Sequence, residues 1–230
     1  MFGWLDQTNA RTDMFTGMIE ATGTVRAMSS VAKGFRLRVD AALAGELLPG
    51  DSVATNGVCL TVTGIGDGGF DVEISPETAR VTTLGALAAG QVVNIERPMR
   101  ADALVGGHFV QGHVDATGCV QEIQPEGECH RVTIAFPDSL AAYLVPRGSV
   151  AVDGVSLTVA QLRGRRFDVQ VIPYTWQHTT FGGYREGDAV NLECDILGKY
   201  VEAPRITPRR SESNLNSYIV FLGIGDSLIC

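Results

Sequence analysis

The second half of this chain repeats the first. A fixed offset of 97 positions aligns Asn56–Val62 (NGVCLTV) with Asp153–Val159 (DGVSLTV), and the same offset holds for five further segments. These are Ser52–Ala54 with Ser149–Ala151, Phe70–Val72 with Phe167–Val169, Pro76–Thr78 with Pro173–Thr175, Thr82–Leu84 with Thr179–Phe181 and Val93–Glu96 with Val190–Glu193. Self-similarity at a fixed period indicates tandem copies of one structural unit. We therefore expect domains at 14–99 and 100–202, after an N-terminal extension (1–13) and before a tail (203–230).

Each copy has the pattern of a small all-β domain. Short runs rich in Val, Ile, Thr and Phe at 53–63, 70–74 and 92–95 are separated by glycine-rich turns such as 64–69. Residues 60–63 alternate apolar with polar, as in a strand that is buried on one face. Many short strands in so small a unit favour a closed Greek-key β-barrel, which leaves no exposed edge.

Helix is expected in few places. Residues 43–48 and 139–144 each have room for a turn or two before the longest strand. In the tail, 203–213 is typical of a linker, and Leu215, Tyr218, Ile219 and Leu222 follow helical spacing. One short amphipathic C-terminal helix is therefore predicted.

Composition narrows the choice of partners. The chain carries 18 Lys and Arg against 26 Asp and Glu, a net charge of −8, which argues against binding to nucleic acid or to an anionic membrane surface. Its 5 cysteines form no C-x-x-C pair and suit neither a disulfide framework nor a zinc site. Residues 1–13 lack the apolar stretch of a secretory signal. We expect a cytoplasmic protein whose partner is a small molecule or another protein.

Polar residues occur at equivalent places in the two copies. Cys59-Leu60-Thr61 aligns with Ser156-Leu157-Thr158. Residues i and i+2 of a strand share a face, so Cys59 and Thr61 point the same way, as do Ser156 and Thr158. One such triplet alone would be interpreted as ordinary strand. Two in register favour two equivalent ligand sites.

Other chemistries have weaker support. His108 and His113 suggest a metal, but a zinc site needs three or four ligands, and none stand at suitable spacing. A hydrolytic triad drawn from Ser156, His113 and Asp153 cannot be recognised from composition alone. No phosphate-binding glycine motif lies between a strand and a helix.

Several long motifs resemble one enzyme family, the riboflavin synthases. They are MFTGMIE at 14–20, NGVCLTV at 56–62, GGHFVQGHVD at 106–115, DGVSLTV at 153–159 and NLECD at 191–195. The resemblance implies two tandem homologous six-stranded Greek-key barrels plus a C-terminal helix. It further implies a homotrimer in which the N-terminal barrel of one subunit faces the C-terminal barrel of the next. The tail departs from the family pattern.

The resemblance also implies a reaction. Riboflavin synthases are transferases that dismutate two 6,7-dimethyl-8-ribityllumazine molecules into riboflavin and 5-amino-6-(ribitylamino)uracil, with no cofactor and no metal. The 7-methyl group is acidic because its carbanion delocalises into the ring. The protein must then hold two rings face to face and move protons.

By resemblance, Cys59 and Thr61 would hold one ring with Gly17, Met18 and Ile19, and Ser156 and Thr158 the other, with Asp195 nearby. The family positions tied to proton handling or to the nucleophile are Ser52, Cys59, His113 and Asp195. Arg147 stands where many members have Lys. The full set of substrate-binding positions implied is Phe15, Gly17, Met18, Ile19, Cys59, Leu60, Thr61, Glu73, Ile74, Ser75, Pro76, Glu77, Thr78, Gly112, His113, Val114, Arg147, Ser156, Leu157, Thr158, Gln170, Val171, Ile172, Pro173, Tyr174 and Thr175.

The main alternative is a lumazine- or flavin-holding antenna protein of the same fold, which binds without turnover. Such relatives usually keep one competent barrel. Here Thr61 and Thr158 are both present, as are Cys59 and Ser156. A scaffold without a ligand would not need polar groups duplicated on the same strand face. The sequence therefore favours the enzyme.

Overall fold

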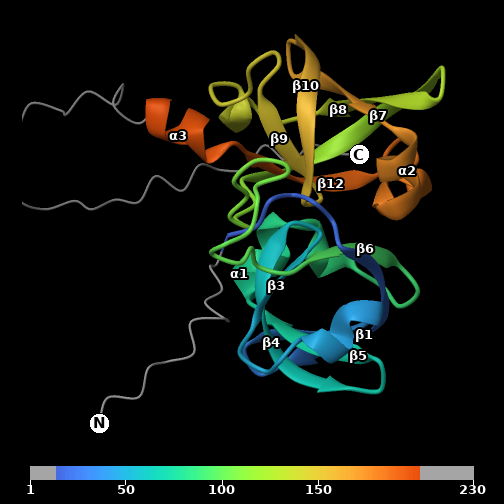
Figure 1. Cartoon of the computed structure of the whole chain (residues 1–230), viewed down its shortest axis with the longest axis vertical. Coiled ribbons are helices and arrows are strands. Elements are labelled where there is room, and N and C mark those ends of the chain that lie inside the picture. The colour runs from blue at the N-terminus through green and yellow to red at the C-terminus, as the bar shows by residue number, and fades with distance from the viewer. Residues whose placement is uncertain (1–13, 203–230) are drawn as a thin grey trace, which may run out of the picture.

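The computed structural model describes residues 14–202, and its first half is a closed antiparallel barrel (Figure 1). Its strands are β1 (Ala21–Val31), β2 (Gly34–Ala41), β3 (Ser52–Thr55), β4 (Val58–Gly66), β5 (Gly69–Ile74) and β6 (Val92–Glu96). Around the barrel they follow the order β1-β2-β5-β4-β3-β6. Strand β5 thus returns beside β2, which gives the Greek-key connection.

The second half forms a barrel of the same topology. Its strands are β7 (Ala116–Glu126), β8 (Cys129–Ala135), β9 (Ser149–Val152), β10 (Val155–Arg163), β11 (Arg166–Val171) and β12 (Ala189–Cys194). Their order, β7-β8-β11-β10-β9-β12, reproduces that of the first barrel strand for strand. The prediction of two tandem six-stranded barrels is confirmed.

The expected long strand over 53–63 is wrong, because a tight hairpin divides it. Asn56 and Gly57 separate β3 from β4 with φ values of 44° and 72°, and Asp153 and Gly154 separate β9 from β10 with 43° and 80°. Two successive residues with positive φ are the mark of a two-residue hairpin turn, for which Asn-Gly and Asp-Gly are the preferred pairs. The dipeptides were visible in the sequence, but the apolar run around them concealed the turn.

Helices are short. They comprise α1 (Pro76–Val81), α2 (Pro173–His178) and α3 (Ile196–Glu202), with 3-10 turns η2 (Ala42–Glu46), η3 (Thr83–Ala86), η4 (Asp138–Leu140) and η5 (Thr180–Gly183). The turn or two of helix expected at 43–48 and at 139–144 correspond to η2 and η4. The Pro-x-Thr segments are the first turns of α1 and α2, since proline is well accommodated there. The helix predicted near Leu215 lies outside the described residues. Within 14–202, no helix is long and apolar enough to cross a membrane.

Apolar side chains fill each barrel. Phe70 and Phe167, at equivalent positions, are fully buried. Leu60 and Val62 of β4 are buried while Thr61 is exposed, so the alternation seen in the sequence places the leucine and valine inside and the threonine outside. Polar residues of the β4 ligand motif therefore lie on the outer surface of the barrel wall.

Two buried asparagines fix the barrels against each other. The Asn94 side chain donates from Nδ2 to the Asp153 carbonyl (2.9 Å), and its Oδ1 accepts from the Thr180 amide (2.8 Å). Asn191, its equivalent, donates to the Asn56 carbonyl (2.9 Å) and accepts from the Thr83 amide (2.8 Å). Each asparagine thus satisfies backbone groups of the opposite barrel, which makes the interface specific as well as apolar.

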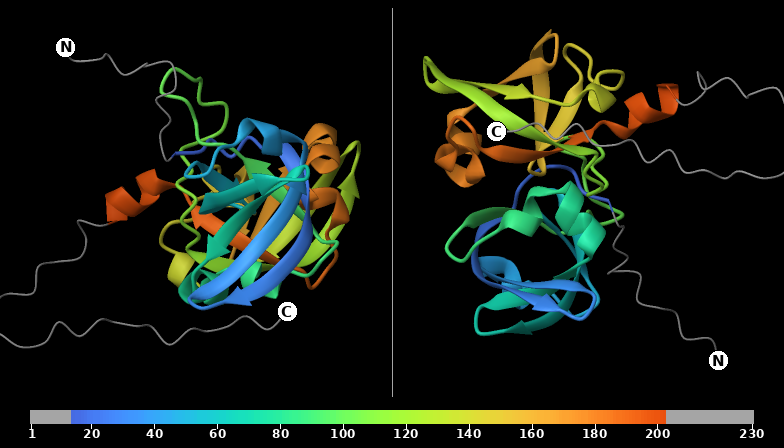
Figure 2. Two further views of the ribbon diagram at one scale, coloured as in Figure 1. Left: turned by 90° about the horizontal axis from the view of Figure 1, so that it is seen from below. Right: turned by 180° about the vertical axis from the view of Figure 1, so that it is seen from behind.

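Between the barrels run two extended segments. We call residues 14–19 the first arm and residues 108–114 the second arm; each precedes the first strand of a barrel. Phe15 and Val110 pair as an antiparallel bridge, with N–O distances of 2.7 and 3.0 Å. In Figure 2 the blue N-terminal segment passes between the barrels. Phe15 is fully buried there in a cluster with Ala54, Val110 and Ala151.

Candidate functional site

Each copy presents its polar ligand motif on one outer face. In the first barrel Ser52 pairs with Thr61 and Ala54 with Cys59 across β3 and β4. In the second barrel Ser149 pairs with Thr158 and Ala151 with Ser156. Residues directly opposite each other in an antiparallel pair share a face. The polar groups of both copies are thus grouped in the same way.

The barrel wall opens beside each motif. Pairing of β4 with β5 ends at Val62–Val72, although β4 begins at Val58 and β5 continues to Ile74. Pairing of β10 with β11 ends likewise at Val159–Val169. An arm occupies each opening, because the Cys59 amide donates to the Gly112 carbonyl and the Ser156 amide to the Gly17 carbonyl, both at 2.9 Å.

The arms cross between the barrels, and this corrects the expected grouping. Gly17, Met18 and Ile19 were expected beside Cys59, but Gly17 lies against Ser156 in the second barrel. The segment against Cys59 is instead the second arm, with Gly112. Each arm leads into one barrel and contacts the ligand strand of the other. Alignment of the two copies cannot reveal this exchange, because it relates equivalent segments without saying which barrel each one touches.

Glycine is required where each arm meets its strand. Gly17 has a φ of +73°, and a Cβ there would lie 2.6 Å from the Ser156 Cβ. Gly112 has a φ of +76°, and a Cβ there would lie 2.5 Å from the Cys59 Cβ. Any side chain would push the arm off the strand, and the left-handed backbone also disfavours one.

A histidine that the sequence did not place in the ligand site lies against Ser156. His108 is buried, and its Nδ1 is 2.7 Å from the Ser156 Oγ. Burial lowers the pKa of His108, while the Asp195 carboxylate acts in the opposite direction. The imidazole is therefore neutral near pH 7, and can accept the proton of the Ser156 hydroxyl. Its Nε2 has no hydrogen-bond partner among residues 14–202.

Several predicted positions can reach a ligand only through their backbone. Leu60, Ile74 and Val171 direct their side chains into the barrel interiors, with exposed fractions of 6%, 1% and 0%. Phe15 packs between the barrels and holds the first arm. Of the other predicted residues, Val114 belongs to the second arm and Leu157 to β10. Ten more lie at the ends of β5 and β11 and in the first turns of α1 and α2: Glu73, Ser75, Pro76, Glu77 and Thr78, and Gln170, Ile172, Pro173, Tyr174 and Thr175.

The predicted proton-handling residues occupy distinct settings. His113 is exposed, and its amide donates to Glu193. Asp195 is half-buried and accepts from the Leu197 amide at the start of α3 (3.0 Å). Its charge acts to raise the pKa of His108, against the effect of burial.

Arg147 adopts an unusual backbone conformation. Its φ is +67°, while Gly50, its equivalent in the first copy, has +94°. A bulky residue in the left-handed region is uncommon and often marks a functional position. Arg147 is also exposed, so its guanidinium is available to a ligand.

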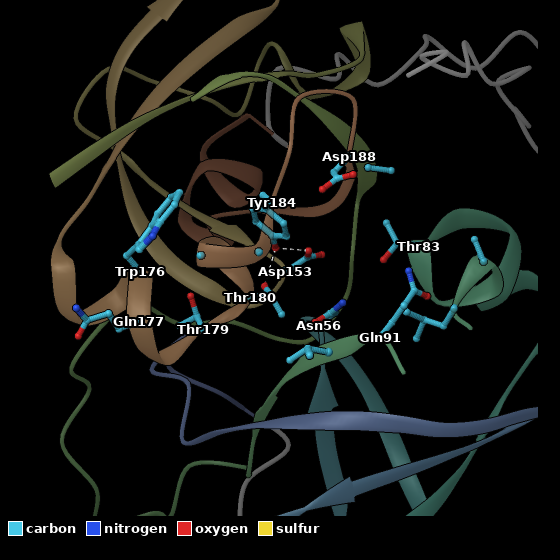
Figure 3. A pocket seen from close by; sticks show the side chains of 16 residues that line it. Asn56, Thr83, Gln91, Asp153, Trp176, Gln177, Thr179, Thr180, Tyr184 and Asp188 are labelled. Carbon is cyan, nitrogen blue, oxygen red and sulfur yellow. Dashed lines mark hydrogen bonds between the residues drawn. The ribbon is translucent and has the colours of Figure 1, made fainter. Parts of the chain in front are cut away.

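A cavity of about 720 Å³ lies elsewhere between the barrels (Figure 3). Equivalent residues of the two copies line it, including Asn56 with Asp153 and Leu87 with Tyr184. The Tyr184 hydroxyl donates to the Asp153 carboxylate over 2.5 Å, and burial raises the pKa of Asp153 to about 7. All of the predicted site residues belong to 14–202, and none of them lines this cavity. Nor do the described residues contain a group of three or more His, Cys, Asp or Glu placed to hold a metal ion.

Sequence comparison matches the two halves to one domain family. The lumazine binding domain matches twice, at residues 16–98 and 111–195. The riboflavin synthase of Bacillus amyloliquefaciens is 41% identical over 189 residues, which cover 82% of this chain and 88% of that protein. The riboflavin synthase of Mycobacterium tuberculosis is 42% identical over 194 residues, covering 82% and 96%. The chain belongs to the riboflavin synthase family.

Solved structures of LumP share the fold of this chain. The crystal structure of LumP complexed with riboflavin covers 78% of this chain and 98% of that chain, with a TM-score of 0.73 and 21% identity. The complex of LumP with 6,7-dimethyl-8-(1'-D-ribityl) lumazine gives a TM-score of 0.71 at 22% identity. At this level of identity the likeness concerns the fold alone.

Proposed function

We propose that this chain is a riboflavin synthase, which dismutates two molecules of 6,7-dimethyl-8-ribityllumazine into riboflavin and 5-amino-6-(ribitylamino)uracil. The observation that carries the proposal is the duplicated site. Each barrel has a gap in its wall, a polar outer face and an arm that is hydrogen-bonded to its ligand strand. A reaction that uses two molecules of one substrate needs two such sites.

The chain's own groups supply proton transfer and orientation. One ring would bind beside Ser156 and Thr158, where the Ser156–His108 pair can take a proton from the acidic 7-methyl group. The other would bind beside Cys59 and Thr61, near Ser52 and His113. Four carbons pass from one lumazine to the other, so the acceptor becomes riboflavin and the donor becomes the pyrimidine product. We propose that no cofactor takes part.

We propose that two copies of the chain cooperate in this reaction. Hydrogen bonds join the ligand strands through both arms, in the order β4, second arm, first arm, β10. With adjacent strands about 4.8 Å apart, Cys59 and Ser156 of one chain are roughly 14 Å apart. This separation of the two ligand strands favours an arrangement in which a ring on one chain meets a ring on another. It thereby supports a homo-oligomer, the trimer that the family resemblance implies.

Exposed apolar side chains support this assembly. Met18 of the first arm is 54% exposed, and Leu104, just before the second arm, is 94% exposed. On α3, Leu197, Tyr200 and Val201 are 62%, 70% and 68% exposed. Apolar patches of this kind beside a ligand site are typical of a surface that a partner covers. A cytoplasmic location remains a prediction from the sequence.

The antenna alternative has a specific discriminating test. LumP chains share the fold, and their solved structures are complexes with a ribityl lumazine and with riboflavin. Titration of this chain with riboflavin, followed by ligand fluorescence, should saturate at two ligands per chain. Saturation at one ligand, with the second barrel unoccupied, would favour an antenna protein over the enzyme.

A further inference from the structure

Two equivalent glutamates hold the arms, and neither has a place in the reaction described above. Glu96 is near the end of β6, and Glu193 occupies the same position in β12. Both belong to the repeated segments Val93–Glu96 and Val190–Glu193. Their exposed fractions are 4% and 3%. A buried carboxylate is costly unless donors surround it, so its partners indicate what it is for.

The partners of Glu96 all lie in the first arm. Its Oε1 accepts from the Thr16 amide (2.7 Å) and the Thr16 hydroxyl (2.8 Å), and its Oε2 accepts from the Gly17 amide (3.0 Å). Both carboxylate oxygens are therefore engaged by two successive residues. The next hydrogen bond along this arm runs from Ser156 to the Gly17 carbonyl.

Glu193 binds the second arm through both of its carboxylate oxygens, as Glu96 binds the first arm. Its Oε1 accepts from the Gln111 amide (2.7 Å) and its Oε2 from the His113 amide (3.0 Å). Between these two residues, the Gly112 carbonyl accepts from the Cys59 amide. The carboxylate and the ligand strand thus hold opposite edges of one short segment.

We propose that Glu96 and Glu193 are crossed positioning residues: Glu96 of the first barrel sets the ligand site at Ser156, and Glu193 of the second barrel sets the site at Cys59. The proposal deepens the proposed function and rests on it for the identity of the ligand. Each glutamate fixes an arm by its backbone amides, and the same arm completes the ligand site of the opposite barrel.

The crossing gives an outcome that simple proximity does not. Glu96 pairs with Ala54, which pairs in turn with Cys59, so on its own barrel Glu96 lies two strands from Cys59. Glu193 pairs with Ala151, which pairs with Ser156. A disturbance transmitted across the strands would therefore affect the site within the same barrel. If each glutamate acts through the arm that it holds, the site of the opposite barrel is affected instead.

The test compares Glu96→Gln with Glu193→Gln in the full chain. Glutamine has nearly the same shape, but its amide nitrogen cannot accept a hydrogen bond and would face a backbone N–H. Glu46→Gln is the control, because it removes the same charge from an exposed residue whose partner is the Arg97 side chain and not an arm amide. Amide hydrogen exchange is measured first, without ligand. E96Q should speed exchange at Thr16, Gly17 and Ser156, and E193Q at Gln111, His113 and Cys59, while E46Q should leave all six unchanged.

Riboflavin is then titrated, with the Cys59 and Ser156 backbone amide resonances as separate reporters of the two sites. E96Q should weaken binding at Ser156 by about tenfold or more and change binding at Cys59 less than twofold, and E193Q should do the reverse. Equal loss at both sites in either variant, or loss mainly at the site in the same barrel as the substituted glutamate, would overturn the crossed assignment. If the unmodified chain binds no riboflavin, the proposed function fails. The exchange pattern still shows whether each glutamate positions the arm at the ligand strand of the opposite barrel.

Discussion

The backbone nitrogen of Ser156 donates a hydrogen bond to the carbonyl oxygen of Gly17, over 2.9 Å, although the two residues belong to different copies of the repeat. The arm that precedes the first strand of the first barrel thus contributes to the proposed ligand site of the second. Because the second arm does the same for Cys59, neither barrel carries a complete site on its own.

Gly17→Ala should show how tightly this contact is built. The new Cβ would collide with Ser156, so we expect weaker riboflavin binding at the Ser156 site and a loss of stability of roughly 2 to 3 kcal/mol. Gly50→Ala is the matched control, since Gly50 also has a positive φ but a Cβ there meets nothing within 4 Å. It should cost only about 1 kcal/mol and leave ligand binding intact. Equal losses of stability and binding in the two variants would show that backbone strain alone is responsible.

His108→Asn and Ser156→Ala should each lower kcat/KM for lumazine turnover by about 100-fold or more, because either change removes the proton-accepting pair. The double variant should be hardly worse than either single one, since both act through the 2.7 Å contact between Nδ1 and Oγ. Steady-state kinetics on the three variants measures this. Losses that multiply would mean that the two side chains act independently.

Arg147→Gly should raise stability while it lowers affinity. Glycine relieves the left-handed backbone, as Gly50 does at the equivalent position, for a gain of about 1 kcal/mol in the free energy of unfolding. If the guanidinium binds the ligand, riboflavin affinity should fall at the same time. Arg147→Lys keeps the positive charge and the strain, so it should show neither the gain in stability nor the full loss in affinity. Unchanged affinity in the glycine variant would remove Arg147 from the site.

Asp153→Asn should reduce the dependence of stability on pH. Burial raises the pKa of Asp153 from 3.8 to about 7, so between these pH values the folded chain keeps a proton that the unfolded chain releases. This group's contribution to the free energy of unfolding therefore falls as pH rises from about 4 to about 7, by up to about 1.4 kcal/mol per pH unit, and is constant above. The fold accepts asparagine here, because Asn56 makes the same contact with Asn94 that Asp153 makes with Asn191, both at 2.7 Å.

Urea denaturation between about pH 5 and pH 6.5 would reveal the difference. Glu96, with its pKa also raised to about 7, and Glu193, with its pKa raised, contribute slopes of the same sign in both proteins. The wild-type slope should be steeper than that of D153N. Identical slopes would mean that Asp153 is already ionised across this range.

The repeat was enough to predict two barrels of one kind, because segments such as Asn56–Val62 and Asp153–Val159 match in register and alternate as strands do. It was also enough to place Thr61 and Thr158 on equivalent faces. The hairpin at Asn56-Gly57 was missed because an apolar run hid a turn signal that the dipeptide itself carried. His108 was considered only as a metal ligand, since its contact with Ser156 joins residues 48 positions apart.

The crossing of the arms was beyond sequence reasoning for a different reason. Gly17 and Gly112 occupy equivalent positions, and the local pattern around each is compatible with docking on either barrel. Contacts far apart in the sequence, such as the packing of Phe15 and Val110 between the barrels and the hydrogen bonds from the arms to Glu96 and Glu193, hold each arm on its strand. The expectation that Gly17 lies with Cys59 failed for that reason.

The most direct test of the account is turnover of 6,7-dimethyl-8-ribityllumazine by the purified full chain, dialysed against EDTA, with no cofactor added. Absorbance and chromatography would follow substrate and both products. We expect one riboflavin and one 5-amino-6-(ribitylamino)uracil for every two lumazines consumed, at a rate that EDTA does not change. Tight binding of lumazine without riboflavin formation, or activity that returns only when a metal is added, would contradict it.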